Sequence, residues 1–275
     1  MVKINSLIQR LTQKSNPVLG LDAYGVIYND TGVFEDIPAV FNYCRDQGIP
    51  IVMMTNNATQ SIPIIQQKMA LANLHLDQSH IISSGCGLHD LPELKALINQ
   101  QSTFVYGYDS SRQYAIDGGA RIVAHPNAAD VIVMAASVGS QNHHVYRSVY
   151  LSLKHRPECH VICINPDHYV SYRNGFMTVM GYYANQLAHQ LQRPDFIWMG
   201  KPYPLFSDLT KHRFEQLGYD PTQLVFCDDN PHNVLKIHQD LNCDGVVITQ
   251  TGIFTKVPPL KNGAGSLFQI PKCKI

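Results

Sequence analysis

Short apolar runs of strand length alternate with segments in which apolar residues recur at helical spacing. The runs predict strands at residues 18–21, 49–54, 81–82, 196–199, 224–227 and 245–249. The periodic segments predict helices around residues 37–47, 61–74, 87–99, 205–217 and 233–241. Repeated strand–helix units of this kind predict an α/β fold, a doubly wound parallel sheet of the Rossmann-like type.

A second set of strand–helix units interrupts the first near residue 100. Strands are predicted at residues 103–108, 121–124, 130–136 and 160–165, with helices at 110–117, 143–155 and 179–192. No low-complexity linker separates the two sets, and the first pattern returns after Arg193-Pro194. We therefore expect a core domain formed by residues 1–95 and 194–275, with an α/β cap domain at 96–193 inserted into it.

Four predicted strands of the core end in polar side chains. They run into Asp22, into Thr55-Asn56-Asn57, into Lys201, and into Asp228-Asp229. In open α/β sheets, ligands bind at the carboxyl ends of the strands. We therefore expect these side chains to converge on one site.

The residue types at these strand ends favour phosphoryl chemistry. Carboxylates that meet at one sheet edge repel each other unless a cation lies between them, and oxygen ligands suit Mg²⁺. Lys201 adds a fixed positive charge, and Thr55 and Asn56 supply hydroxyl and amide donors. In such a site Asp22 could attack phosphorus and form an aspartyl-phosphate.

Composition narrows the function further. The 275 residues include 21 basic and 21 acidic side chains, so nothing favours a nucleic-acid partner or an acidic membrane surface. The longest apolar stretches are far short of a membrane span, and the N-terminal segment lacks the continuous apolar core of a signal peptide. Seven cysteines without CxxC pairs are typical of reduced thiols. We expect a cytoplasmic protein and leave a homodimer open.

The four polar blocks, in their order, resemble a known family. DAYGV, TNN, GKPYP and CDDNPHNV look like motifs I to IV of the haloacid dehalogenase (HAD) superfamily. The interval between Asp22 and Thr55 is too short for a cap domain, whereas the interval from Thr55 to Lys201 is long enough. This spacing resembles class IIA, whose α/β cap is inserted between motifs II and III. Asn165-Pro166-Asp167 is similar to the turn carried by those caps.

The resemblance implies roles for individual residues. The candidate catalytic residues are Asp22 as nucleophile, Lys201 and Tyr24. A Mg²⁺ ion would be bound by Asp22, by the backbone carbonyl of Tyr24 and by Asp228. Asp229 and Asn233 would support these ligands without contacting the ion. The phosphoryl group and the rest of the substrate would contact Thr55, Asn56, Asn57, Lys201, Asn165 and Asp167.

This chain departs from the family at Tyr24. HAD phosphatases carry an aspartate there, which protonates the leaving oxygen and later activates water. General acid–base catalysis contributes roughly 10²- to 10⁴-fold in rate, and a tyrosine with a pKa near 10 is a poor base at neutral pH. Motif IV also differs, with Cys227 in place of the usual glycine and Asn233 where an acidic residue is common.

We therefore expect a Mg²⁺-dependent phosphatase of weak activity that acts on a small phosphorylated metabolite through an aspartyl-phosphate. Two alternatives stay open. One is a non-catalytic relative that binds a phosphorylated ligand or a protein partner. The other is a carbon–halogen hydrolase, because haloacid dehalogenases also carry an aromatic residue two positions after the nucleophile, although their cap lies elsewhere.

The predicted cap holds further candidates. Tyr169, Tyr172, Tyr182 and Tyr183 could stack on an aromatic substrate, although ordinary packing is the default for tyrosines. Arg173 lies near the Asn165-Pro166-Asp167 turn and is a candidate for substrate contact, with a salt bridge as the equal alternative.

Overall fold

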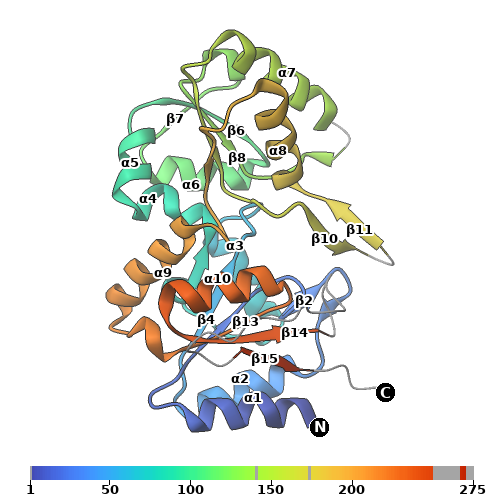
Figure 1. Cartoon of the computed structure of the whole chain (residues 1–275), viewed down its shortest axis with the longest axis vertical. Coiled ribbons are helices and arrows are strands. Elements are labelled where there is room, and N and C mark those ends of the chain that lie inside the picture. The colour runs from blue at the N-terminus through green and yellow to red at the C-terminus, as the bar shows by residue number, and fades with distance from the viewer. Residues whose placement is uncertain (1, 140–141, 173–174, 250–266, 271–275) are drawn as a thin grey trace.

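The structure is built around a six-stranded parallel sheet (Figure 1). It is a computed structural model, and it describes residues 2–139, 142–172, 175–249 and 267–270. The strand order is β15-β14-β13-β1-β4-β5. The strands span Leu267–Ile270 (β15), Asp244–Ile248 (β14), Leu224–Asp228 (β13), Val18–Leu21 (β1), Ile51–Thr55 (β4) and Ile81–Ser83 (β5). Strand β1 is central, with β13 on one side and β4 on the other.

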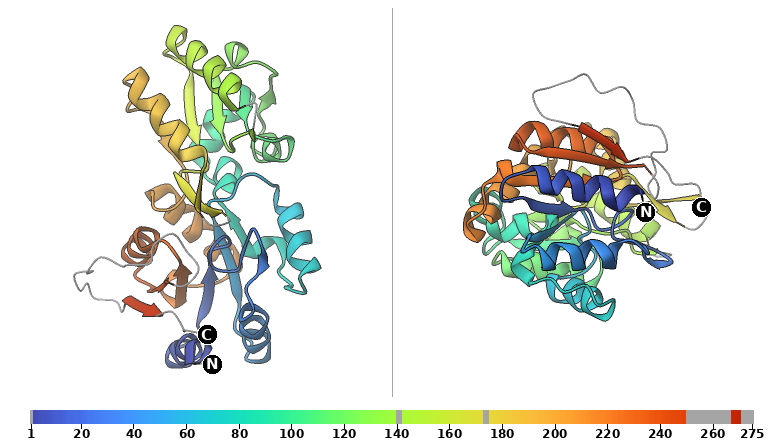
Figure 2. Two further views of the ribbon diagram at one scale, coloured as in Figure 1. Left: turned by 90° about the vertical axis from the view of Figure 1, so that its right-hand side faces the viewer. Right: turned by 90° about the horizontal axis from the view of Figure 1, so that it is seen from below.

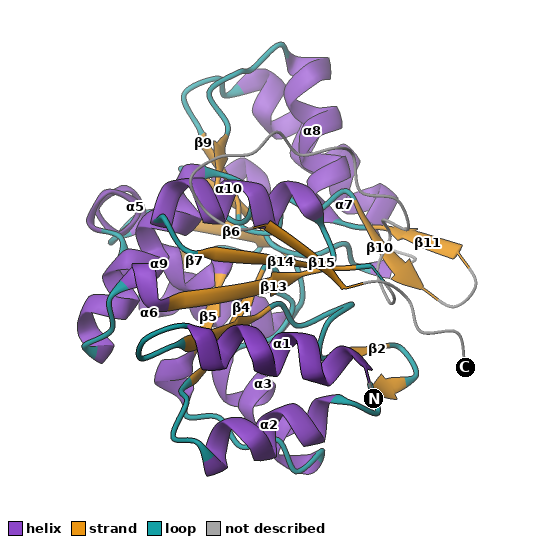
Figure 3. Cartoon of the chain, turned by 60° about the horizontal axis from the view of Figure 1, so that its bottom comes forward, coloured by secondary structure: helices purple, strands orange, loops and turns teal. Residues whose placement is uncertain are grey.

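Helices cover both faces of this sheet (Figure 3). One face packs against α1 (Val2–Gln13), α2 (Ile37–Asp46) and α3 (Ile62–Leu71). The other face packs against α9 (Pro204–Leu217) and α10 (Pro231–Leu241). Successive residues of β1 point to opposite faces, so Val18 and Leu19 belong to different apolar clusters. Burial on both faces explains why these strands are apolar throughout.

A second parallel sheet lies beyond the first, with the order β12-β9-β8-β6-β7 (Figures 1 and 2). Its strands span Ile197–Trp198 (β12), His160–Cys163 (β9), Val131–Met134 (β8), Ser102–Tyr106 (β6) and Arg121–Ile122 (β7). One face packs against α7 (Asn142–His155) and α8 (Met180–Leu191). The other faces α4 (Gly87–Asp90), α5 (Pro92–Ile98) and α6 (Arg112–Asp117). These helices share an apolar cluster with α9 and α10, so one continuous core joins the two sheets.

Two hairpins complete the described part of the chain. Strands β2 (Tyr28–Asn29) and β3 (Gly32–Val33) follow β1 directly. Strands β10 (Tyr169–Tyr172) and β11 (Gly175–Thr178) form an antiparallel hairpin between β9 and α8. This second hairpin projects from the second sheet towards the carboxyl end of the first (Figure 1).

The predicted fold class is confirmed: the chain has a doubly wound parallel core sheet and an inserted α/β cap built on the second sheet. The predicted helix over residues 87–99 is two helices, α4 and α5, because Leu91 is extended before Pro92. Neither the hairpin β10–β11 nor strand β15 was predicted. The division of the chain at residues 96 and 193 stays a prediction.

One predicted strand pairs with a different sheet from the one expected. We expected residues 196–199 to form a core strand, yet β12 pairs with β9 in the sheet of the cap. An apolar run indicates burial but does not specify which sheet buries it. Lys201 therefore follows a strand of the cap sheet and reaches the core site through the connecting turn.

All six described cysteines are buried free thiols. Among the described residues, no helix has the length and apolar character needed to span a bilayer.

Candidate active site

Asp22 lies at the carboxyl end of the central strand of the core sheet. Its backbone N–H donates to the Cys227 carbonyl at 2.8 Å, which extends the pairing of β1 with β13 by one residue. The side chain is 12% exposed. Gly25 then turns the chain with φ +96°, and a Cβ there would lie 2.6 Å from Oδ2 of Asp229. Glycine at this position allows the loop after β1 to approach the acidic residues after β13.

Lys201 is the buried cation of the site. Its ammonium donates at 2.7 Å to each of three acceptors: Oδ1 of Asp22, Oδ2 of Asp228 and the carbonyl of Met54. The side chain is 1% exposed. Burial alone lowers the pKa of Lys201, but the charges of Asp22 and Asp228 raise it more strongly, so the ammonium is the stable form. The residue thus ties together three strand ends of the core sheet, as the sequence suggested.

Three carboxylates gather beside this ammonium. One oxygen each from Asp22, Asp228 and Asp229 lie within 4.8 Å of one another. Burial raises the pKa of Asp22 to about 7, because the favourable charge of Lys201 is partly offset by the like charge of Asp228. Burial, followed by the charges of Asp228 and Asp22, also raises the pKa of Asp229 well above its ordinary value. The protein alone therefore does not hold all three carboxylates comfortably in the ionised form.

This cluster fits a divalent cation. Three ionised carboxylates and one ammonium leave two negative charges unbalanced in a buried site, which a dication would neutralise. Asn233 donates through Nδ2 to Oδ2 of Asp228 at 3.1 Å, while its buried Oδ1 has no partner among the described residues. That oxygen can accept from a water of a hydrated metal ion. The sequence predicts that Asp229 supports the metal ligands without contacting the ion. In the structure its carboxylate lies close enough to those of Asp22 and Asp228 to be a ligand itself.

The turn after β4 carries residues that the sequence predicts to contact a phosphoryl group, and their side chains make different hydrogen bonds. Thr55, at the end of the strand, accepts the Asn57 N–H through Oγ1 at 3.1 Å, which leaves its hydroxyl hydrogen free to donate. Asn57 lines a cavity that opens above the carboxylates. Its Oδ1, however, accepts from Thr59, from the backbone N–H at 3.0 Å and from Oγ1 at 2.6 Å. Asn57 therefore shapes the turn with its side chain.

Asn56 uses its side-chain amide to join the core to the cap. Its Oδ1 accepts the Lys201 N–H at 2.7 Å, and its Nδ2 donates to the Lys201 carbonyl at 2.8 Å. The same Nδ2 donates to Oδ1 of Asp167 at 2.9 Å. The side-chain amide of Asn56 is therefore committed to these three bonds.

A cavity of about 240 Å³ opens above the carboxylates, between core and cap. Its core side carries the acidic cluster and the turn after β4. Its cap side carries Tyr169, Val170, Ser171, Met177 and Val179, together with Asn165 and Asp167. Among the described residues that line it, none is a lysine or an arginine. The cavity is thus polar and acidic at one end and mainly apolar at the other.

Tyr24 also bridges core and cap. Its hydroxyl donates to the Ser171 carbonyl of β10 at 2.5 Å, and its ring lies edge-on to that of Tyr28 at 6.2 Å. Burial, followed by the negative charge of Asp30, raises the pKa of the Tyr24 phenol above its ordinary value. A phenol held in this way is not a base at neutral pH.

The structure brings nearly all of the predicted residues to this one cavity. Lys201 contacts the carboxylates from the protein side, and the rest line the cavity: Asp22, Tyr24, Thr55, Asn56, Asn57, Asn165, Asp167, Asp228, Asp229 and Asn233. Arg173 lies outside the described residues.

The hairpin residues that face the cavity were missed as a group. Tyr169 was considered only for stacking, and Val170, Ser171 and Met177 were not considered. The sequence does contain a signal: Asn174-Gly175 between two segments rich in β-branched and aromatic residues is typical of a hairpin. The contact of Ser171 with Tyr24 has no sequence signal.

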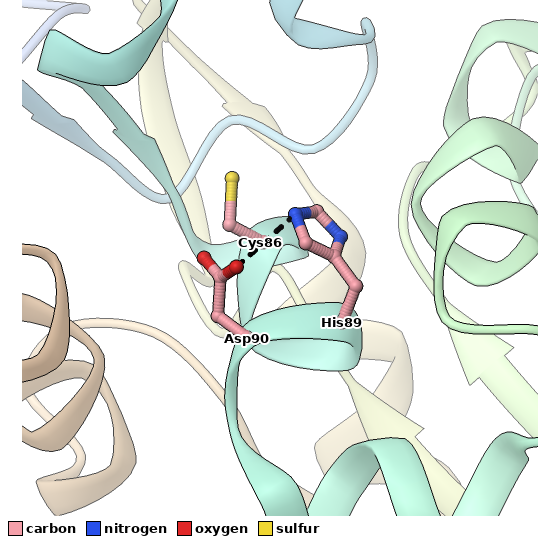
Figure 4. Close-up of side chains that lie close together, drawn as sticks. All are labelled: Cys86, His89 and Asp90. Atoms are coloured by element: carbon pink, nitrogen blue, oxygen red, sulfur yellow. Dashed lines mark ion pairs between the residues drawn. The ribbon is translucent and has the colours of Figure 1, made fainter. Parts of the chain in front are cut away.

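A second group of potential ligands lies in α4 and the turn before it, formed by Cys86, His89 and Asp90 (Figure 4). Arg213 of α9 already donates to Asp90 at 2.6 Å. Burial raises the pKa of the Cys86 thiol to about 11, so it stays protonated, and burial lowers the pKa of His89. Because a guanidinium occupies the position of the cation, this group is an ion pair that joins α4 to α9.

A family model matches part of the sequence, and solved structures of other proteins share the fold. Residues 19–121 match the family model described as haloacid dehalogenase-like hydrolase. A search of curated proteins finds no match. The match to the family model covers the segment that contains Asp22 and Thr55.

Solved structures with the same fold cover nearly the whole chain. A p-nitrophenyl phosphatase from Archaeoglobus fulgidus is 17% identical with a TM-score of 0.72, over 87% of this chain and 88% of that one. NagD from E. coli K-12 is 17% identical with a TM-score of 0.72, over 94% and 97%. A possible sugar phosphatase from Cytophaga hutchinsonii is 20% identical with a TM-score of 0.76, over 92% and 89%. The chain thus shares its fold with these solved phosphatases, and residues 19–121 match the haloacid dehalogenase-like hydrolase model.

Proposed function

We propose that this chain is a Mg²⁺-dependent phosphatase that hydrolyses a small phosphate monoester through an aspartyl-phosphate at Asp22. One observation carries the proposal. A buried carboxylate, held by a buried ammonium and flanked by two further carboxylates, forms the floor of a cavity whose other lining residues, apart from Asp167, are uncharged. Such an arrangement suits a reaction in which a phosphoryl group with dispersed negative charge is transferred.

In this reaction Lys201 orients the nucleophile. Because its ammonium binds Oδ1 of Asp22, Oδ2 is the oxygen directed at phosphorus. The hydroxyl of Thr55 and the backbone N–H of Asn56 would bind phosphoryl oxygens. Asp22, Asp228 and Asp229 would hold the Mg²⁺ ion. The ion would offset the repulsion between the negative phosphate and the negative carboxylates. The backbone carbonyl of Tyr24 is a further proposed ligand.

The cavity favours a small substrate with one phosphate. Drug-sized ligands occupy cavities of roughly 300–1,000 Å³, and this one is about 240 Å³. Its cap side offers Tyr169, Val170, Met177 and Val179 to the part of the substrate that leaves. These side chains offer mainly apolar surface to that part of the substrate. We propose that the cap, residues 96–193, selects an uncharged and largely apolar leaving group.

Tyr24 affects which leaving groups depart quickly. Its hydroxyl is donated to Ser171 and cannot protonate a leaving oxygen. We therefore expect aryl and acyl phosphates, whose leaving groups need little protonation, to react faster than alkyl phosphates. Equal rates on both would count against this part of the proposal.

The engagement of Tyr24 also favours one second candidate, a protein that binds a phosphorylated ligand without turning it over. The same screen tests both. Wild-type protein and Asp22→Asn are incubated with Mg²⁺ and a panel of phosphate monoesters, with chlorinated acids as the test of carbon–halogen hydrolysis. We expect phosphate release that needs Mg²⁺ and is lost in Asp22→Asn. Ligand-dependent stabilisation without release would favour the binding protein.

A further inference from the structure

The proposed phosphatase, on which this inference rests, needs a source of protons to release its less acidic leaving groups at all, because Tyr24 does not supply one. Among the residues that the structure describes, the titratable side chains that line the cavity are Asp22, Tyr24, Asp167, Tyr169, Asp228 and Asp229. Asp22 is the proposed nucleophile, and Asp228 and Asp229 join it in the cation cluster. The Tyr24 hydroxyl is donated to a backbone carbonyl, and Tyr169 is an exposed phenol at the edge of the cavity. Asp167 is the carboxyl that remains.

Asp167 is held in a defined orientation on the cap side. Its Oδ1 accepts Nδ2 of Asn56 at 2.9 Å. Within the described part of the chain, no other donor bonds to this carboxylate, so Oδ2 has no hydrogen bond there, and the residue lines the cavity.

The turn that carries Asp167 packs tightly between core and cap. Pro166 fits against Gly181 and Gly200: an added Cβ would lie 2.1 Å from the Pro166 carbonyl oxygen at the first and 2.5 Å from Pro166 Cδ at the second. The Asp167 carbonyl accepts the Gly181 N–H at 3.0 Å. Rigid support of this kind is what a proton donor needs to meet a leaving oxygen.

We propose that Asp167 is the general acid and base of this site, acting from the cap in place of the carboxylate that the loop after Asp22 lacks. In the first step Oδ2 of Asp22 bonds to phosphorus, the bond from phosphorus to the leaving oxygen breaks, and that oxygen takes the proton of the Asp167 carboxyl. In the second step the oxygen of a water bonds to phosphorus and its proton returns to Asp167. The bond from phosphorus to Asp22 then breaks, which releases inorganic phosphate and restores both carboxyl groups.

The electrostatics of Asp167 suit both steps. Burial raises the pKa of Asp167 to about 6, although the bond from Asn56 and the charge of Lys201 act in the opposite direction. A carboxyl with a pKa close to the working pH can both give and take a proton. The charge of Asp167 also raises the pKa of Asp22, so the two groups are near enough to interact.

The test compares leaving groups in Asp167→Asn. Asparagine keeps the size of the side chain and an oxygen that can accept from Asn56. The values of kcat/KM are measured for wild type and variant on a nitrophenyl phosphate and on an alkyl phosphate. An alcohol with a pKa near that of water, about 16, needs a proton on leaving, whereas a nitrophenolate does not. Asp109→Asn is the matched control, because it removes an exposed carboxylate in the turn before α6.

We expect Asp167→Asn to lower kcat/KM roughly 10²- to 10⁴-fold on the alkyl phosphate and less than about tenfold on the nitrophenyl phosphate. A purely structural residue would lower both equally, and that result, or no loss on either, would overturn the inference. Wild-type turnover of the nitrophenyl ester with none of the alkyl ester would also overturn it. No wild-type turnover of either ester would instead contradict the proposed function.

Discussion

Addition of Mg²⁺ should stabilise this protein, and the size of the effect should depend on pH. Asp22 and Asp229 have pKa values raised in the folded protein above those of the unfolded chain. Without metal, the folded state therefore holds protons that the unfolded state has already lost, and stability falls as pH rises from about 4 through about 7. Bound Mg²⁺ favours the ionised carboxylates and removes this penalty. The stabilisation by Mg²⁺ should consequently be large at about pH 8 and small at about pH 5.

The magnitude follows from mass action. At a Mg²⁺ concentration of about 100 times Kd, binding to the folded state alone contributes roughly 2.7 kcal/mol. For a chain of this size each kcal/mol raises Tm by about 2–4 °C, so the expected rise at about pH 8 is roughly 5–10 °C. Loss of a carboxylate in Asp229→Asn should weaken binding about 10- to 100-fold and leave roughly 0.4–1.4 kcal/mol at the same concentration.

Thermal unfolding followed by circular dichroism, with Mg²⁺ or with EDTA, measures this directly. Asp208→Asn, which removes an exposed carboxylate on α9, is the matched control and should respond as the wild type does. An equal rise in Tm at both pH values would refute the reasoning, as would a full response in Asp229→Asn. Either result would mean that Mg²⁺ does not bind through the clustered carboxylates.

Three other substitutions test the contacts that hold the site. Lys201→Met leaves two buried carboxylates unpaired and should lower the free energy of unfolding by about 3–5 kcal/mol in urea; a loss below about 1 kcal/mol would contradict the pairing. Tyr24→Phe removes the bond to Ser171 and should cost about 0.5–1.5 kcal/mol, with faster amide hydrogen exchange in β10 and β11; unchanged exchange would argue against the tie. Gly25→Ala places a Cβ at positive φ, 2.6 Å from the Asp229 carboxylate, and should cost about 1–3 kcal/mol while weakening the Mg²⁺ response; a neutral result would mean that the loop can move away.

The core elements could be predicted because their signals are local. Apolar runs that end in a polar residue mark strands β1, β4 and β13, and each ends where expected to within about two residues. Since parallel strands share a carboxyl edge, the neighbourhood of Asp22, Thr55 and Asp228 follows from the sequence order and the fold class.

Other features depend on contacts between distant segments and could not be predicted. Strand β12 pairs with β9 in the cap sheet, and its own residues, Ile197 and Trp198, do not encode which sheet it joins. The commitment of the Asn56 side chain to Lys201 and Asp167 likewise requires core and cap to be placed together. The sequence predicts that these residues lie near one another, but their bonds follow only from the assembled structure.

The central claim is that Asp22 forms a covalent phosphoryl intermediate, and trapping that intermediate tests it most directly. The protein is mixed with Mg²⁺ and an aryl phosphate, quenched in acid during turnover, digested, and analysed by mass spectrometry. The account predicts a phosphoryl adduct on the peptide that contains Asp22, and no adduct and no turnover in Asp22→Asn. Turnover that persists in Asp22→Asn, or an adduct on a different residue, would contradict it.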